Sequence, residues 1–260
     1  MMDKKTVEYE TLCMETLELA GRLITENGGE IFRVEETITR MGHGLKLDRV
    51  ECFATPTGLF ISMSQDDRPV RTSVFRLRTG DTDLDKVNRV NQISRDVESG
   101  VLDLEAAHKA LLEIKNTPSR IPAWVTCLGS GLTACGFSVL FGGKLPEMGV
   151  AFIIGVLTWV LLLQVPKLGV SRTAPTLLVS TLITLSLTVL CKLTGVFDQN
   201  ALIPGSLMPL VPGLAMTGAV QDTMRGDTLS GLSSGMRAIL TAVLIAAGAI
   251  LGVRLAGMIL

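Results

Sequence analysis

Five apolar segments, each about as long as a bilayer core is thick, dominate the chain after Pro118. A helix needs roughly 20 predominantly apolar residues to cross the hydrocarbon region. Several such runs in succession predict an α-helical integral membrane protein with about five transmembrane helices. The predicted spans are Pro122–Phe141, Met148–Val165, Pro175–Leu193, Ala201–Val220 and Ala238–Met258.

Most of the charged residues lie before the first span, where the sequence predicts a small α+β domain. Two amphipathic helices, the second over about Glu30–Leu45, precede two strand-like stretches and two further helices. Asp103 is the expected N-cap of the last of them. We therefore predict a domain over residues 1–117 and a transmembrane domain over residues 118–260.

The start of the chain is charged and helix-periodic, without the apolar core of a secretory signal, so we expect it to stay in the cytoplasm. The positive-inside rule agrees, because most basic residues then fall on the inner side. These residues are Lys115, Arg120, Lys167, Arg172, Arg225 and Arg237. Five spans place the C-terminus outside, in a multi-pass protein of the cell (inner) membrane.

Several function classes find no support in the sequence. The net charge is −1, and no basic–aromatic pattern suggests a nucleic-acid partner. There is no P-loop and no spacing of histidines and cysteines typical of a metal site. No nucleophile–base pair is recognisable either, so we expect no enzymatic activity, no catalytic residue, no metal and no cofactor.

The fourth span is interrupted by Pro204, Pro209, Pro212 and Gly213. Each proline removes a backbone donor and disturbs the preceding turn. Broken helices survive in a membrane mainly where protein or water lines them, and transporters use them to bind substrates. The alternative is a kink that serves packing alone. We favour a substrate-binding segment.

Two acids follow this segment. Asp222 and Asp227 lie at the predicted inner rim of the membrane, beside Arg225. Ionisable groups next to a membrane path are candidates for proton coupling. Equally, they could be ordinary loop carboxylates that pair with Arg225 and cap the next helix.

A polar stripe runs along the third span, where Ser180, Thr184, Thr188 and Lys192 recur at intervals of four. It could line a hydrophilic path. Alternatively, the hydroxyls bond back to their own helix or join neighbouring helices. In the last span, Gly248 and Gly252 form a G-x-x-x-G pattern that suits close helix approach.

Four stretches, in this order, resemble the ThrE-type threonine/serine exporter family, specifically its amino-terminal half, the YjjP-like subunit. They are "AGRLITENGGEIFRVEETITRMGHGL", "FATPTGLFIS", "VNQISRDVESG" and "LMPLVPGLAMTGAVQDTMRGDTLSGL". The resemblance covers essentially the whole chain from about residue 10.

The resemblance implies export of small polar metabolites, such as threonine and serine or dicarboxylates such as succinate. It also implies a separate, small YjjB-like membrane subunit as a partner in an oligomer within the lipid bilayer. The proline-rich family signature falls on Pro209, Pro212, Gly213, Asp222, Gly226 and Asp227. A second signature in the first domain falls on Gly28, Gly29, Glu30, Arg33 and Glu35.

The first hypothesis is therefore a subunit of a secondary-active exporter driven by the proton gradient. Asp222 or Asp227 would accept a proton or cation, and Arg225 or Arg172 would meet a substrate carboxylate. The alternative is a membrane-anchored regulatory or scaffolding subunit whose partner forms the substrate path.

Overall fold

The chain forms two compact units. The computed structural model describes residues 4–65, 68–77, 80, 82–164 and 174–260. The first unit contains residues 1–120 together with 217–235, and the second contains 121–216 together with 236–260. A short segment from late in the sequence therefore folds with the N-terminal part. Lys167 and Arg172, which the orientation argument uses, lie outside the described residues.

Four helices of the first unit confirm the predicted helical pattern. They are α1 (Lys4–Glu26), α2 (Ile31–Gly44), α3 (Leu84–Glu98) and α4 (Leu104–Asn116). The apolar face expected for α2 is buried throughout. Asp103 caps α4 as predicted, because its carboxylate accepts a hydrogen bond of 2.8 Å from the backbone N–H of Ala106.

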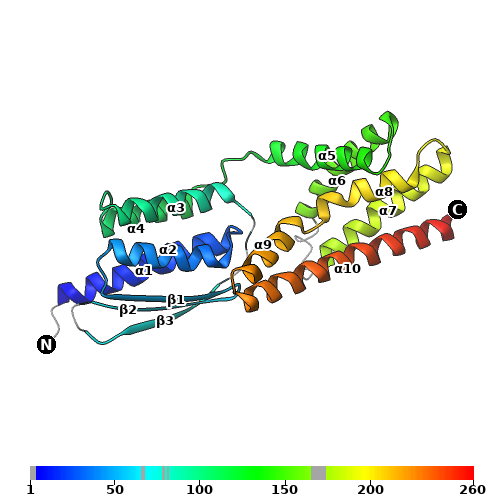
Figure 1. The fold of residues 1–260 in the computed structure, drawn as a ribbon. Coiled ribbons are helices and arrows are strands. Elements are labelled where there is room, and N and C mark those ends of the chain that lie inside the picture. Colours follow the sequence, from blue (N-terminus) through cyan, green and yellow to red (C-terminus); the bar gives the residue numbers. More distant parts are fainter. Residues whose placement is uncertain (1–3, 66–67, 78–79, 81, 165–173) are drawn as a thin grey trace. The chain divides into compact units, whose positions relative to one another are not determined.

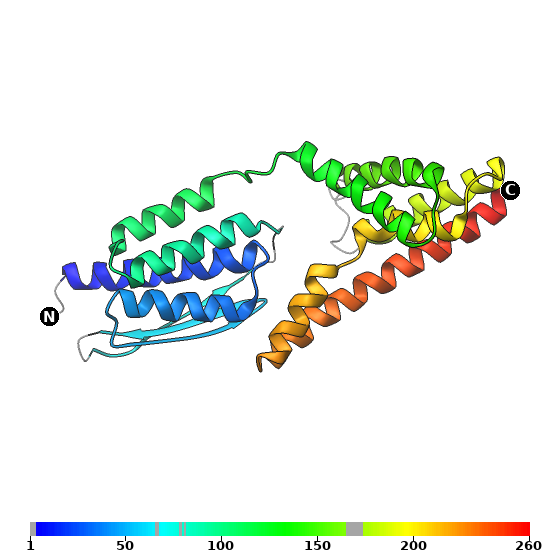
Figure 2. The same cartoon turned by 45° about the horizontal axis from the view of Figure 1, so that its top comes forward.

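Three antiparallel strands complete the first unit: β1 (Arg49–Thr55), β2 (Gly58–Ser64) and β3 (Arg71–Arg76), with β2 in the centre. A two-residue turn joins β1 to β2, where Thr55 pairs with Gly58. Side chains alternate between the two faces of a strand, and the inner face of β2 buries Leu59, Ile61 and Met63. Helices α1 and α2 pack on this face, and α3 and α4 pack on them in turn (Figure 1 and Figure 2).

The second unit is built from long apolar helices. They are α5 (Ala123–Leu140), α6 (Leu145–Gln164), α7 (Ala174–Thr194), the short α8 (Gln199–Leu207), and parts of α9 (Gly213–Met224) and α10 (Thr228–Ile259). Four helices of the described chain are long and apolar enough to cross a membrane, and a bent pair would make a fifth span. The predicted number of spans is thus consistent with the structure.

Many large apolar side chains of this unit are exposed, which is the pattern expected of a surface that faces lipid. Leu132, Leu140, Ile153 and Ile250 are each more than half exposed. In water such a surface would be unfavourable, but lipid tails are as apolar as these side chains. The interior of the unit centres on α7, where Val179, Ile183 and Leu187 are buried with residues of neighbouring helices.

Helix α10 is longer than the sequence pattern predicts. It begins at Thr228, ten residues before the expected start of the last span. The added turns are polar and rich in glycine and serine, which hydropathy does not detect. They pack closely on α9, because a Cβ atom on Gly231 would lie 2.8 Å from the carbonyl oxygen of Ala219.

Candidate functional site

The predicted interruption of the fourth span is present. Helix α8 ends at Leu207, a short 3₁₀ turn (η2) covers Met208–Leu210, and α9 begins at Gly213. The two halves are bent by 61°. At the break, Val211 has an extended backbone, with φ −66° and ψ 128°. The segment is therefore a broken span or a re-entrant loop rather than one kinked helix.

The prolines explain where the break occurs. Pro209 lies inside η2 and has no N–H to continue the hydrogen bonds of α8. Pro212 forces Val211, the residue before it, out of the helical region. Pro204, by contrast, lies within α8 without ending it. The break is thus a local consequence of Pro209 and Pro212 together.

The helix before the break packs tightly on α5. A Cβ atom on Gly205 would lie 2.6 Å from the backbone of Ser138, so only glycine fits there. Beside this contact, the hydroxyls of Ser138 and Ser206 are buried and have no hydrogen-bond partner among the described residues. Sequence reasoning missed both, because isolated serines carry no periodic signal. They add polar groups next to the broken helix.

The three hydroxyls of the polar stripe lie inside the protein, whereas Lys192 at its end is exposed. Ser180, Thr184 and Thr188 are at most 1% exposed. Two of them face α10, because a Cβ on Gly248 would collide with Ser180 and one on Gly252 would lie 2.8 Å from Thr184. The G-x-x-x-G pattern therefore does bring α7 and α10 close together, and the stripe forms part of their interface.

The hydrogen-bonding groups of the stripe do not all have partners, however. The Ser180 hydroxyl donates to the carbonyl oxygen of Leu177, and Thr188 accepts a hydrogen bond of 3.3 Å from the Gln199 amide. The Thr184 hydroxyl has no partner within the described part of the chain. The stripe thus combines helix packing with one buried, unpaired hydroxyl.

Glu147, at the start of α6, is a buried acid that sequence reasoning missed. It is 4% exposed. Its carboxylate accepts hydrogen bonds from the backbone N–H groups of Lys144 at 3.0 Å and Asp198 at 3.1 Å. Two donors satisfy the charge, so Glu147 holds the turn before α6 against the start of α8.

The signature of the first domain begins with a tight turn. Gly28 has a φ of +80°, a conformation that favours glycine and ends α1. Gly29 lies so close to α1 that a Cβ atom there would be 2.5 Å from the Ile24 side chain. Glu30 then precedes α2 and forms an ion pair with Arg33. The two glycines thus fix the position where α2 starts.

Asp222 lies at that start. It occupies the last turn of α9, within the part of the chain that belongs to the first unit, and is 3% exposed. Its carboxylate interacts favourably with the backbone N–H of Ile31, the first residue of α2. Glu30, the residue at the N-cap position, makes no capping bond with its own side chain. Asp222 therefore serves as the cap of α2 from a distant part of the sequence.

Asp227 and Arg225 complete this cluster. The backbone N–H of Asp227 donates to the carbonyl of Asp222 at 2.9 Å, across a turn in which Gly226 has a φ of +92°. One carboxylate oxygen of Asp227 accepts a hydrogen bond of 3.3 Å from the Ser230 hydroxyl at the start of α10. The guanidinium of Arg225 lies over the Phe32 ring, 3.5 Å from its centroid. This distance is typical of a cation–π contact.

Glu35 extends the cluster along α2. Its carboxylate accepts a hydrogen bond of 2.9 Å from the backbone N–H of Ala54, on the open edge of β1. Burial raises the pKa of Glu35 above its ordinary value; the Ala54 hydrogen bond opposes this shift, and the charge of Asp227 adds to it. The two signatures are thus in contact, through Asp222 with Ile31 and through Arg225 with Phe32.

One oxygen of Asp222 and one of Asp227 are buried without a hydrogen-bond partner among the described residues. A buried, incompletely paired carboxylate gains from binding a proton or a cation. Within the described residues, no group of three or more histidine, cysteine, aspartate or glutamate side chains is arranged to hold a metal ion. The arrangement places two incompletely paired carboxylates at the end of α9 and the turn that follows it.

Comparison with known proteins identifies the family of the chain. The model of the ThrE family, described as "Putative threonine/serine exporter", matches residues 15–256. The chain belongs to the ThrE family. Family membership and the apolar helices together describe a multi-pass membrane protein of a transport family. No solved structure matches the chain.

Relatives of ThrE type are similar to the chain at low identity. A "Probable threonine/serine exporter" of Mycobacterium tuberculosis is 23% identical over 225 residues, which are 84% of this chain and 41% of the relative. The chain thus spans less than half the length of that protein. A "Probable succinate transporter subunit YjjP" of Klebsiella aerogenes is 23% identical over 90% of each chain. Its Escherichia coli counterpart is 23% identical over 95% of this chain and 94% of its own length.

Proposed function

We propose that this ThrE-family chain is one subunit of a secondary-active exporter of small polar metabolites. The substrate would be threonine and serine or a dicarboxylate such as succinate, and the driving force the proton gradient. The observation that carries the proposal is the break between α8 and α9, on the same helix that ends in the buried acid Asp222.

In this proposal the break contributes to the substrate path. A span that stops and restarts inside a membrane requires polar partners for its backbone, which a water-filled cavity supplies. Pro209, Pro212 and Gly213 would shape the site, and the unpaired hydroxyls of Ser138 and Ser206 would add polar groups beside it. Ser180, Thr184 and Thr188 would act from the α7 side.

Asp222 is the proposed proton acceptor. It is buried, it keeps one oxygen unpaired, and Asp227 and Glu30 add negative charge nearby. Protonation would weaken the interaction of Asp222 with the N-terminus of α2. A neutral carboxyl group is a weaker hydrogen-bond acceptor than a carboxylate, and it has no charge to interact with the helix dipole. A proton on Asp222 would thereby change how firmly the end of α9 is held against the start of α2.

The proposed topology has the first unit in the cytoplasm, the C-terminus outside, and the helices in the cell inner membrane. We further propose a separate, YjjB-like membrane subunit as partner. The relatives named YjjP are called transporter subunits and align with this chain over nearly their full length. The M. tuberculosis exporter, by contrast, is matched over only 41% of its length.

Reconstitution tests the proposal. Three kinds of proteoliposome would be prepared: one with this chain alone, one with the partner alone, and one with both. Uptake of labelled serine, threonine and succinate would then be measured under an imposed pH gradient. We expect transport only when both chains are present, and loss of transport in Asp222→Asn.

Transport by the partner alone would instead support the second candidate, a regulatory or scaffolding subunit. The observation that favours this candidate is the contact of α2 with the segment around Asp222 and Arg225, because such a contact can transmit a signal without lining a path. Transport in no combination would refute the exporter proposal for these substrates.

A further inference from the structure

A polar hollow in the first unit lies outside both signatures. It lies between α1 and the edge strand β3 and has a volume of about 330 Å³. Its lining residues are Thr11, Met14, Glu15, Arg71, Thr72 and Ser73. Pockets for small ligands begin at roughly 300 Å³, so this hollow suits a metabolite of a few heavy atoms.

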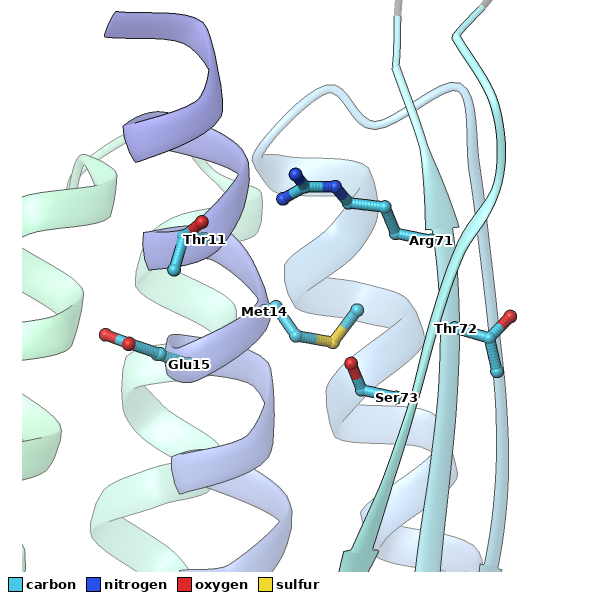
Figure 3. Close-up of a pocket in the computed structure, with 6 residues that line it drawn as sticks. All are labelled: Thr11, Met14, Glu15, Arg71, Thr72 and Ser73. Carbon is cyan, nitrogen blue, oxygen red and sulfur yellow. The ribbon is translucent and has the colours of Figure 1, made fainter. Parts of the chain in front are cut away.

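Arg71 is the main charged group that faces the hollow. Figure 3 shows its guanidinium extending from β3 toward α1, while Met14 and Ser73 point toward each other across the gap. Thr72 and Glu15 lie at the rim, with side chains that point away from Arg71. The hollow thus has a cationic end, a hydroxyl and an apolar floor.

An ion pair holds Arg71 in place and uses only one of its three guanidinium nitrogens. Its Nε binds Glu10 at 3.1 Å, and Arg68 binds the other oxygen of the same carboxylate at 2.8 Å. Glu10 is 6% exposed, whereas the Arg71 side chain is 38% exposed, so a buried carboxylate holds a partly exposed guanidinium. The Nε contact is the one ion pair that Arg71 makes among the described residues, which leaves its two terminal nitrogens available.

Glu10 engages only part of the Arg71 guanidinium. Its carboxylate contacts the Nε of Arg71, and the terminal nitrogens of Arg71 have no partner among the described residues. A planar guanidinium with two free N–H groups binds a carboxylate in a bidentate way. The ligand that fits this end is therefore a small carboxylate.

The other residues that line the hollow restrict the kind of carboxylate that can bind. The Thr11 hydroxyl donates to the carbonyl oxygen of Val7 at 2.7 Å, and its lone pairs can accept from an ammonium or hydroxyl group. Glu15 adds a negative charge at the mouth, which disfavours a second carboxylate and favours an ammonium group. Met14 supplies apolar contact for a short carbon chain.

We propose that this hollow is an effector site for a small α-amino acid, bound through its carboxylate to Arg71. The site lies wholly within the first unit and is separate from the proposed substrate path. Binding there requires no assumption about transport. Its use as a sensor of substrate level rests on the proposed exporter function.

Equilibrium binding tests the site. Labelled L-serine would be titrated into the full chain in detergent or nanodiscs, without a partner and without a pH gradient. We expect saturable binding that Arg71→Gln weakens by about ten- to hundred-fold, as the loss of charge-assisted hydrogen bonds implies. Arg76→Gln is the matched control, because Arg76 lies on the same strand with its side chain exposed on the opposite face.

A second variant distinguishes loss of the binding site from unfolding of the protein. Ser73→Leu fills the hollow and leaves the ion pairs of Glu10 in place, so it should also abolish serine binding while thermal unfolding stays unchanged. Succinate should compete less well than serine. Absence of serine binding to the wild-type chain would overturn the proposal. So would wild-type affinity in both Arg71→Gln and Ser73→Leu.

These outcomes are separable from failure of the exporter proposal. Flux in proteoliposomes reports on transport, whereas serine binding by the isolated chain reports on the hollow. Serine binding that is lost in Asp222→Asn but kept in Arg71→Gln would belong to the transport path and would also overturn the effector site.

Discussion

Substitution of Asp222 separates its two roles, as the cap of α2 and as the proposed proton acceptor. Asp222→Ala removes the acceptor of the Ile31 N–H, and Asp222 is 3% exposed, so water cannot readily replace it. Asp222→Asn keeps an oxygen that can still interact with the Ile31 N–H, but it cannot take up a proton. The two variants should therefore differ in stability and agree in export.

The magnitude follows from the loss of the carboxylate that interacts with the Ile31 N–H. Leaving a buried donor unpaired costs about 1–3 kcal/mol. For a chain of this length, each kcal/mol lowers the midpoint of thermal unfolding by about 2–4 °C, so Asp222→Ala should lose about 2–12 °C. Asparagine caps helices about as well as aspartate, so Asp222→Asn should lose less than about 1 kcal/mol.

Two measurements on each variant are needed: thermal unfolding of the purified chain, and export of labelled substrate from cells with equal amounts of protein in the membrane. Asp48→Asn is the control, since Asp48 is an exposed carboxylate of the same unit. Normal export by Asp222→Asn would refute the proton-acceptor role. An Asp222→Ala protein as stable as wild type would refute the cap.

Three further predictions concern packing and charge. Gly252→Val should destabilise the protein by about 1–3 kcal/mol in a thermal unfolding assay, because a Cβ there would lie 2.7 Å from a backbone oxygen of α7. Gly257→Val should be neutral in the same assay, because nothing lies within 4 Å of a Cβ at that position. Burial raises the pKa of Glu35 in the folded state above the ordinary carboxyl pKa of the unfolded chain. The contribution of Glu35 to stability is therefore fully present below the unfolded-state pKa and is lost as pH rises through the folded-state pKa. In a plot of unfolding temperature against pH, Glu35→Gln should flatten this decline. A double-mutant cycle of Arg225→Ala and Phe32→Ala should give a coupling of about 0.5–1 kcal/mol, and a coupling of zero would show that the ring contact contributes nothing.

The sequence alone predicted the elements whose signals are local. The apolar face of α2, the Asp103 cap and the long apolar runs were confirmed because periodicity, capping and span length depend on neighbouring residues. The break after α8 was also predictable, since proline acts on the residues next to it. The early start of α10 was not, because its polar first turns form by packing on α9 rather than by hydropathy.

The site itself depended on the tertiary structure. The sequence could identify Asp222 and the glycines before α2 as unusual, but not that the carboxylate of Asp222 meets the Ile31 N–H. It could mark a polar stripe on α7, but not that Gly248 and Gly252 cover it. Nor did it show that Arg71 lines a hollow with its terminal nitrogens unpaired among the described residues.

The physical reason for this division is the range of the interactions. Helix formation, span length and proline breaks are decided by residues within a few positions of one another, so the sequence by itself determined a chain with membrane helices, one of them broken. Caps supplied from a distant segment, ring contacts and unpaired buried carboxylates arise only when remote segments pack. The tertiary structure therefore decided which acids, hydroxyls and arginines are buried and incompletely paired, and these are the groups for which we propose a role in binding.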